Sequence, residues 1–202
     1  MGLKAKKLSF MTAYGYLLAC GGFLGFLASM ILTIDKMKLL ADPSYVPDCN
    51  INPIISCGSV MVKEQASVFG FTNSLIGVAS FAAICAVGAA ILAGATFKRW
   101  FWLGLQLAVT LAICFIGWLF FQSVYELNTL CPYCLVVWIV TIPIFWYTTL
   151  GNLHSGAIPI PIRMKSAVAF LKRHHADILV AWYLLIICVI LNHFWYYWST
   201  LL

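Results

Sequence analysis

The sequence predicts an all-α integral membrane protein with five transmembrane helices. Hydrophobic residues make up 63% of the 202 positions and charged residues only 9%, whereas soluble domains carry about 25% charged residues. The few charges divide the chain into five uncharged stretches, each with the roughly 20 residues that a helix needs to cross the hydrocarbon core. These stretches are 8–34, 65–97, 100–125, 127–162 and 178–202.

The first helix is expected over residues 10–33 and is rich in glycine, alanine and serine, which allow helices to pack closely in lipid. Its apolar run is longer than the roughly 7–15 residues of a signal-peptide core, so we expect the helix to be retained. The following loop, residues 35–68, contains Pro43, Pro47 and Pro53, which mark turns. Because isoleucine, valine and methionine give this loop an apolar side, we expect it to cap the membrane surface.

Four further helices are expected over residues 70–95, 100–125, 131–150 and 178–199. Lys98 and Arg99 form a tight turn between the second and third helices. The basic, proline-containing segment 151–176 connects the fourth helix to the fifth, which ends in a cluster of aromatic side chains typical of a membrane interface. The sequence contains no internal repeat, so residues 1–202 are expected to form a single transmembrane domain.

The distribution of basic residues predicts the orientation in the membrane. With the N-terminus in the cytoplasm, nine of the twelve lysines and arginines lie inside, and three lie outside. The inner set is Lys4, Lys6, Lys7, Lys98, Arg99, Arg163, Lys165, Lys172 and Arg173, and the outer set is Lys36, Lys38 and Lys63. This topology places Leu202 outside. It also explains the net charge of +6, with some attraction to anionic membrane lipid and without nucleic acid as a partner.

Four of the eight cysteines are expected together at the outer face. Cys49 and Cys57 lie in the loop with seven residues between them, and Cys131 and Cys134 form a C-P-Y-C motif where the fourth helix begins. A C-x-x-C motif at the start of a helix is typical of a redox-active dithiol, because both sulfurs lie near the positive end of the helix dipole. Cys134, one turn deeper, is well placed to attack a lipid-soluble electrophile. Four cysteines are expected to be packing residues, namely Cys20, Cys85, Cys114 and Cys188.

These residues leave three interpretations open. The two pairs can pass electrons between disulfides through a mobile loop, or the loop pair can be a fixed staple. Alternatively, the four cysteines can bind zinc. A non-enzymatic metal-binding or structural membrane protein with static disulfides is therefore an alternative to a redox enzyme. Gln122 is a further candidate site residue, because polar groups inside a membrane helix are costly.

The combination of motifs resembles the vitamin K epoxide reductase family. The resemblance rests on the C-x7-C pair that ends in Ile54-Ile55-Ser56-Cys57, on Phe69-Gly70-Phe71 followed by Asn73-Ser74-Leu75-Ile76-Gly77, and on Tyr125-Glu126-Leu127-Asn128 before the C-P-Y-C motif. It covers the first four helices, and the fifth helix is similar to that of prokaryotic members. The resemblance implies a four-helix bundle around a quinone of the menaquinone, ubiquinone or vitamin K type. A fifth transmembrane helix would lie beside the bundle, and an outer capping loop would join the first two helices.

By position, the resemblance also implies the roles of the four cysteines. Cys134 would meet the quinone, and Cys131 would be its exchange partner. Cys57 would attack Cys131, and Cys49 would face the external reductant. The implied function is a membrane quinone reductase of the bacterial inner membrane that oxidises an external thioredoxin-fold protein and so drives disulfide formation in exported proteins.

Further positions match or depart from the family pattern. Asn73 matches an asparagine that hydrogen-bonds a quinone carbonyl. Trp138 stands where vertebrate members have a tyrosine that hydrogen-bonds the quinone, and the indole N–H of Trp138 can form this hydrogen bond in its place. Lys63 stands where many relatives have a serine. Some bacterial members carry a fused thioredoxin-like domain after the fifth helix. Because this chain stops at Leu202, the partner is expected to be a separate, DsbA-like polypeptide.

Two related enzymes are alternatives to the interpretation as a quinone reductase with a thioredoxin-fold partner. A vitamin K epoxide reductase is the nearer one, since the same motifs serve it. A DsbB-type oxidase performs the same thiol-to-quinone reaction on a four-helix bundle. It is disfavoured because its C-x-x-C motif lies in the first outer loop, whereas here the C-P-Y-C motif follows the separated pair.

Overall fold

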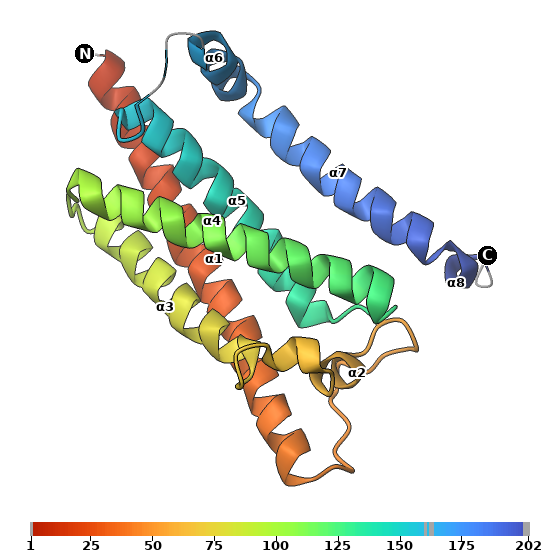
Figure 1. Ribbon diagram of the computed structural model, residues 1–202. Helices are drawn as coiled ribbons and strands as arrows, with labels where there is room; N and C mark the ends of the chain where they lie inside the picture. The colour runs from red at the N-terminus through yellow and green to blue at the C-terminus, as the bar shows by residue number, and fades with distance from the viewer. Residues whose placement is uncertain (1, 160, 162–163, 200–202) are drawn as a thin grey trace. The chain divides into compact units, whose positions relative to one another are not determined.

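The computed structural model describes residues 2–159, 161 and 164–199, and over that part of the chain it contains helices and no β-strand (Figure 1). Five helical segments are long and apolar enough to cross a membrane: Phe10–Ala41, Asn73–Leu92, Arg99–Glu126, Pro132–Ser155 and His175–His193. The predicted class, an all-α multi-pass membrane protein, is therefore confirmed. The predictions made for Arg163 and Leu202 concern residues outside the described part.

Helix α1 covers Gly2–Ala41 and continues about two turns beyond the predicted end at residue 33. Six of the eight residues 34–41 are lysine, methionine, leucine or alanine, and all four types favour helix. The helix stops at Asp42, because a residue that precedes proline disfavours the helical conformation. The Asp42 side chain then accepts a hydrogen bond from the backbone N–H of Ser44, 2.9 Å away, which forms a local turn.

The loop after α1 is more ordered than the sequence predicts, because it contains two short helices. Helix α2 covers Cys57–Met61 and starts at Ser56, whose side chain accepts a hydrogen bond from the backbone N–H of Ser59. The 3-10 helix η1 covers Glu64–Ser67. Helix α3, Asn73–Leu92, is shorter at both ends than predicted. It ends just before Gly94, which has a φ of 86° and so takes the left-handed conformation that closes many helices.

The remaining elements have the following bounds. Helix α4 covers Arg99–Phe121 and continues as one π-helical turn, η2, over Gln122–Glu126. Helix α5 covers Pro132–Ser155 and contains Pro143. Helices α6 (Lys165–Arg173), α7 (His175–His193) and α8 (Trp195–Trp198) follow. The predicted fifth helix is therefore divided at Phe194, and the predicted connector contains a short helix.

The chain forms two compact units. The first consists of Met1–Thr96 with Thr129–Ile144, and the second of Phe97–Asn128 with Phe145–Leu202. Helix α5 contributes to both units. The four-helix bundle around a quinone and the single domain over the whole chain stay predictions.

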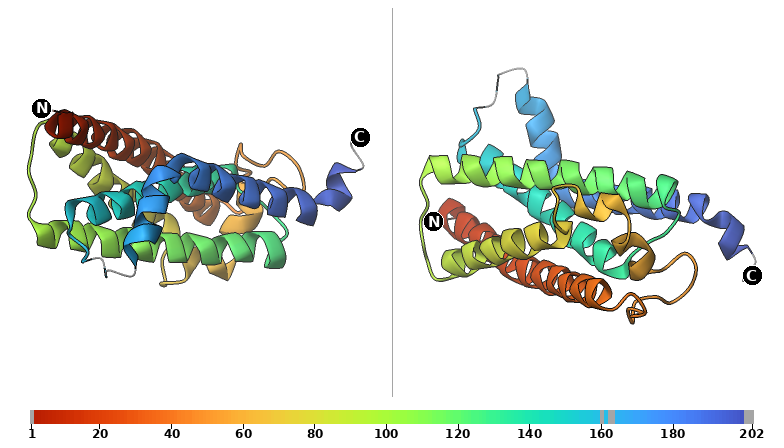
Figure 2. Two further views of the ribbon diagram at one scale, coloured as in Figure 1. Left: turned by 90° about the horizontal axis from the view of Figure 1, so that it is seen from above. Right: turned by 60° about the horizontal axis from the view of Figure 1, so that its bottom comes forward.

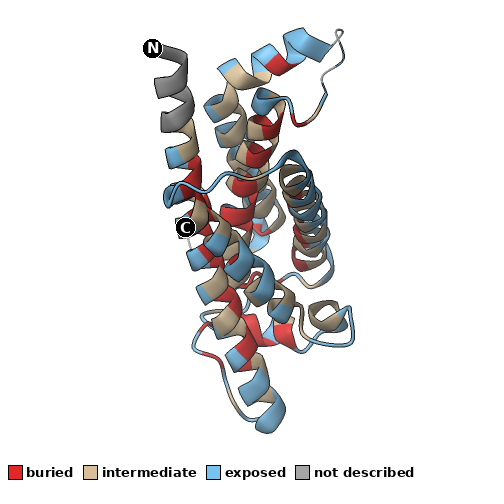
Figure 3. Ribbon diagram, turned by 90° about the vertical axis from the view of Figure 1, so that its left-hand side faces the viewer, coloured by how far each residue is buried: buried red, intermediate tan, exposed pale blue. Residues whose placement is uncertain are grey.

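In the first unit, α1 and α3 lie side by side (Figures 1 and 2). Their backbones approach closely, because a Cβ atom on Gly22 would lie 2.6 Å from the backbone nitrogen of Cys85. On the same helix, Gly21 faces the Ile144 side chain of α5. Buried positions accordingly run along α1 (Figure 3). The small residues of the first helix therefore provide the close helix contacts that the sequence predicts.

In the second unit, polar side chains join α4 to α5. The side chain of Gln106 donates a hydrogen bond to the hydroxyl of Thr149, 2.9 Å away, and accepts one from the buried amide of Asn152 at 3.0 Å. A polar group in lipid needs such partners. These contacts therefore give Gln106, one of the isolated polar residues of the membrane helices, a structural role.

Candidate redox site

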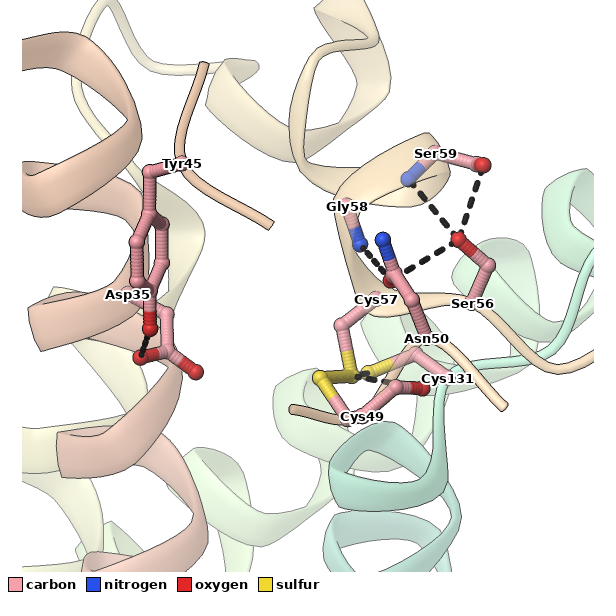
Figure 4. Close-up of a disulfide and its surroundings, with 9 residues drawn as sticks. All are labelled: Asp35, Tyr45, Cys49, Asn50, Ser56, Cys57, Gly58, Ser59 and Cys131. Atoms are coloured by element: carbon pink, nitrogen blue, oxygen red, sulfur yellow. Dashed lines mark hydrogen bonds between the residues drawn. A yellow bond between two sulfur atoms is a disulfide. The ribbon is translucent and has the colours of Figure 1, made fainter. Parts of the chain in front are cut away.

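All four predicted redox cysteines lie in the first unit. Cys49 and Cys57 form a disulfide with a Cα–Cα distance of 5.6 Å, whereas Cys131 and Cys134 are free thiols. The sulfur of Cys131 lies 3.3 Å from the sulfur of Cys57 (Figure 4). The structure thus holds one pair oxidised and one pair reduced, with a thiol of the second pair in contact with the disulfide of the first.

A short backbone pairing brings these two cysteines together. Ile55 and Leu130 form an isolated parallel β-bridge. The N–H of Leu130 donates to the carbonyl of Ile54 at 2.7 Å, and the N–H of Ser56 donates to the carbonyl of Leu130 at 3.0 Å. Ser56 and Leu130 each immediately precede one of the two contacting cysteines, so the bridge fixes Cys57 beside Cys131.

Side-chain hydrogen bonds shape the nine-residue loop that the disulfide closes. The oxygen of the Asn50 amide accepts hydrogen bonds from the N–H of Gly58 at 2.9 Å and from the hydroxyl of Ser56 at 3.0 Å (Figure 4). The side-chain oxygen of Asn52 accepts from the N–H groups of Ile54 and Ile55 at 3.0 and 2.7 Å. Asparagine is suited to such turns because its side chain bonds the backbone a few residues on.

The site is buried. Cys49 is 6% exposed, Cys57 0% and Cys131 1%, and these three pack together with Met61. Partly buried side chains surround them, namely Leu32, Leu39, Val60, Tyr133 and Cys134. Burial of this degree keeps the thiols of folded proteins away from Cys57 and Cys131, so exchange between these two cysteines proceeds within the molecule.

The local electrostatics favour Cys131 as a nucleophile. The hydrogen bond from the Cys134 side chain lowers the pKa of Cys131 below its usual value. The backbone N–H groups of Cys134 and Tyr133 act in the same direction, whereas burial and the carboxylate of Asp35 oppose the shift. Hydrogen bonds of this kind stabilise a thiolate at the start of a helix. A Cys131 thiolate in contact with Cys57 can attack it, forming the Cys57–Cys131 bond and releasing Cys49.

The lowered pKa predicts the pH dependence of the Cys131 thiolate. Because a depressed pKa preserves the charged form as the pH falls, the ultraviolet absorbance of this thiolate should appear at a lower pH than that of an ordinary thiol. Cys134→Ala removes the largest favourable contribution and should move the transition to higher pH. Cys134→Ser keeps a hydrogen-bond donor and is the matched control. The titration needs a protein in which Cys20, Cys49, Cys57, Cys85, Cys114 and Cys188 are replaced by alanine, so that the Cys131 thiolate has no disulfide to attack. Identical transitions in the alanine and serine variants would contradict the assignment.

The three other predicted site residues have different surroundings. Asn73 begins α3, where its amide donates to the carbonyl of Gln65 at 2.7 Å and accepts from the N–H of Val68 at 3.2 Å. Asn73 therefore joins α3 to the segment around η1. Trp138 is buried on α5, one turn after Cys134. Gln122 begins η2 and belongs to the second unit. The roles of these residues towards a quinone stay predictions.

Two residues at the site were not predicted from the sequence. The hydroxyl of Tyr45 donates a hydrogen bond to the carboxylate of Asp35 at 3.0 Å, and Asp35 is buried on α1. The sequence prediction assigned residue 35 to the loop. The spacing of Leu32, Asp35 and Leu39 was the available signal, since residues three and seven apart share one helix face.

The cysteine arrangement also bears on the zinc alternative. Across the residues that the structure describes, no group of three or more histidine, cysteine, aspartate or glutamate side chains is placed to hold a metal ion. Structural zinc sites use thiolates, and the sulfurs of Cys49 and Cys57 are bonded to each other. In this redox state the four cysteines therefore cannot form a four-thiolate site.

Comparison with protein families gives a match over most of the chain. The family model described as the vitamin K epoxide reductase family matches residues 16–149, about two thirds of the chain. The matched segment includes both cysteine pairs and runs from α1 to near the end of α5. A search among curated proteins gives no match.

Proposed function

The chain belongs to the vitamin K epoxide reductase family and is therefore a membrane oxidoreductase, and from this premise we propose that it transfers electrons from a separate thioredoxin-fold protein to a quinone. The observation that supports this most directly is the 3.3 Å contact between the sulfurs of Cys131 and Cys57. Thiol–disulfide exchange requires a thiolate to reach a disulfide sulfur, and this contact meets the requirement.

Electrons would first enter through the loop pair. A thiolate of the partner attacks Cys49, breaks the Cys49–Cys57 bond and releases Cys57 as a thiolate. The second thiol of the partner then breaks the mixed disulfide, so the partner leaves as a disulfide with two electrons fewer. Cys49 and Cys57 are left as thiols.

The second exchange passes the electrons to the pair at the start of α5. The Cys57 thiolate attacks Cys131 in a Cys131–Cys134 disulfide, and Cys134 leaves as a thiolate. Cys49 then attacks Cys57, which restores the loop disulfide and releases Cys131. The products are one disulfide and two thiols, the redox state that the structure contains. A bound quinone would supply the acceptor for the two electrons and two protons of Cys131 and Cys134.

Several side chains have the chemistry that a quinone site needs. Cys134 is partly buried on the first turn of a membrane-spanning helix. Asn73 has a second amide N–H besides the one that donates to Gln65. Trp138 provides an indole N–H within an apolar helix, and Gln122 provides an amide. We assign Asn73 and Trp138, both of the first unit, as candidates to hydrogen-bond the carbonyl groups of the ring, and Gln122 stays a candidate on the sequence alone.

The proposal includes a location and an orientation. The topology predicted from the sequence would place nine of the twelve basic residues on the cytoplasmic side. The redox cysteines then face the outer side of a bacterial inner membrane, where exported proteins acquire disulfides. The reaction would thus drive disulfide formation in exported proteins through a DsbA-like partner.

The proposal is tested with protein purified into lipid nanodiscs. Reduced DsbA-like protein and either ubiquinone or menaquinone are added, and the quinone absorbance is followed. We expect one quinol for each partner disulfide formed. The Cys131→Ala variant is the control and should produce no quinol. Vitamin K epoxide is added in a parallel reaction, and its reduction in place of quinone would favour the epoxide reductase. Cysteines that remain in one redox state under all conditions would instead indicate a non-enzymatic protein.

A further inference from the structure

The last two turns of α1 hold the cysteine loop at both ends. The carboxylate of Asp35 accepts a hydrogen bond from the Tyr45 hydroxyl at 3.0 Å, and the ammonium group of Lys38 lies 5.3 Å from the centre of the Tyr45 ring. The ammonium group of Lys36 donates to the carbonyl of Met61. Tyr45 precedes Cys49 by four residues, and Met61 follows Cys57 by four. Both flanks of the disulfide are therefore tied to one helix.

The flank that contains Tyr45 leads directly into Cys49, the cysteine assigned to the partner. Pro47, between Tyr45 and Cys49, is fully buried. The carbonyl of Pro47 also accepts a hydrogen bond from the N–H of Asn50 at 3.0 Å. Residues 45–50 thus form a strap whose first residue is hydrogen-bonded to Asp35, and Figure 4 shows both this bond and the disulfide.

The closed strap permits exchange between the two cysteine pairs and prevents exchange with a partner protein. Cys57 contacts Cys131, so exchange between the two pairs needs no movement of the strap. Cys49 is 6% exposed. An attacking thiolate must approach along the S–S bond, and a thiol on a folded protein cannot enter a buried site as a small reductant can. Leu32 and Leu39 of α1 pack against the cysteine cluster, so the strap, which carries Cys49, must move away before a partner protein reaches this cysteine.

We propose that the hydrogen bond between Tyr45 and Asp35 is the latch of this strap and determines how readily a protein reductant reaches Cys49. Tyr45 and Asp35 are then positioning residues for the exchange, and neither touches the reacting sulfurs. The latch rests on the proposed function, which assigns Cys49 as the entry point for electrons. The latch controls access to Cys49, so its loss should change the rate of reduction by a small reductant less than the rate of reduction by a protein.

The test compares the rates at which two reductants open the Cys49–Cys57 disulfide. The protein reductant is reduced thioredoxin and the small one is tris(carboxyethyl)phosphine, and no quinone is present. Tyr45→Phe removes the hydroxyl and keeps the ring under Lys38. Loss of a hydrogen bond to a charged group should raise the thioredoxin rate about tenfold, with a clearly smaller change in the phosphine rate. Alkylation followed by mass spectrometry measures both.

Two further variants separate the latch from a general loss of structure. Asp35→Asn keeps an oxygen that accepts the Tyr45 hydrogen bond, so it should stay closer to the wild-type rate than Asp35→Ala does. Tyr16→Phe changes an exposed tyrosine of the same helix and should leave both rates unchanged. A preserved phosphine rate in Tyr45→Phe shows that the disulfide site is still folded.

The outcomes separate the latch from the proposed function. Equal thioredoxin rates in the wild type and Tyr45→Phe overturn the latch and leave the electron path intact, as do thioredoxin and phosphine rates that rise by the same factor. If thioredoxin reduces none of the proteins, the proposed type of partner is wrong, and the latch is wrong with it. A selective rise in the thioredoxin rate supports both.

Discussion

Replacement of Cys134 by alanine is expected to abolish quinol formation and to trap a disulfide between Cys57 and Cys131. In this variant Cys131 has no neighbour in its own motif with which to form a disulfide. Its sulfur remains 3.3 Å from that of Cys57, so its thiolate attacks the loop disulfide and the mixed disulfide accumulates. Loss of the residue that delivers electrons to the acceptor should reduce turnover by roughly a thousandfold or more. Proteolysis of the alkylated protein and mass spectrometry identify the trapped bond.

The matched control for this experiment is Cys188→Ala. Cys188 is an exposed free cysteine of α7, and its loss should change neither turnover nor the disulfide pattern. If Cys131 is found free in the Cys134→Ala protein, or bonded to Cys49, the proposed order of electron transfer is wrong.

The second large effect is expected from Cys49→Ser, which separates two kinds of electron donor. Without Cys49 a partner protein loses its point of attack, so turnover driven by a thioredoxin-fold protein should fall by roughly a hundredfold or more. A small dithiol can enter the site and reduce Cys131 directly or through Cys57. Quinol formation driven by dithiothreitol should therefore persist.

A fixed staple predicts a different result for the same variant. Loss of a purely structural disulfide would loosen the loop over Cys131, lower the melting temperature and impair both reactions in parallel. Measurement of both activities and of thermal unfolding on one Cys49→Ser preparation distinguishes the two. Parallel loss of both activities would rule out the relay through Cys49.

The spanning helices could be predicted from the sequence because a charged side chain in hydrocarbon carries a large cost. The same rule gave the wrong end for the first helix. Asp35 was taken as the first residue of the loop, but its carboxylate is hydrogen-bonded to Tyr45 and the helix continues to Ala41. A charge that obtains a hydrogen-bond partner from the loop that follows the helix does not mark the end of that helix.

Only part of the chemistry of the site could be predicted from the sequence. The C-P-Y-C spacing and the loop pair predicted two redox-active cysteine pairs, and in the structure one pair is a disulfide and the other consists of free thiols. The contact between Cys57 and Cys131 depends on the single bridge between Ile55 and Leu130, and one pair of residues leaves no periodic pattern in a sequence. For Asn73, the sequence indicates a hydrogen-bond donor but cannot show that the carbonyl of Gln65 already uses it.

The spacing of the cysteines along the chain has a consequence for the biogenesis of the protein. Cys57 and Cys131 are 74 residues apart, a length that a ribosome adds in roughly 4 to 15 s. Cys49 is only eight residues from Cys57, and Asn50 and Asn52 fold the segment between them through local hydrogen bonds. Where an oxidant is present, Cys57 therefore meets Cys49 before Cys131 has been synthesised. The order of translation itself selects the loop disulfide, and a newly made chain would begin its first catalytic cycle with that pair already oxidised.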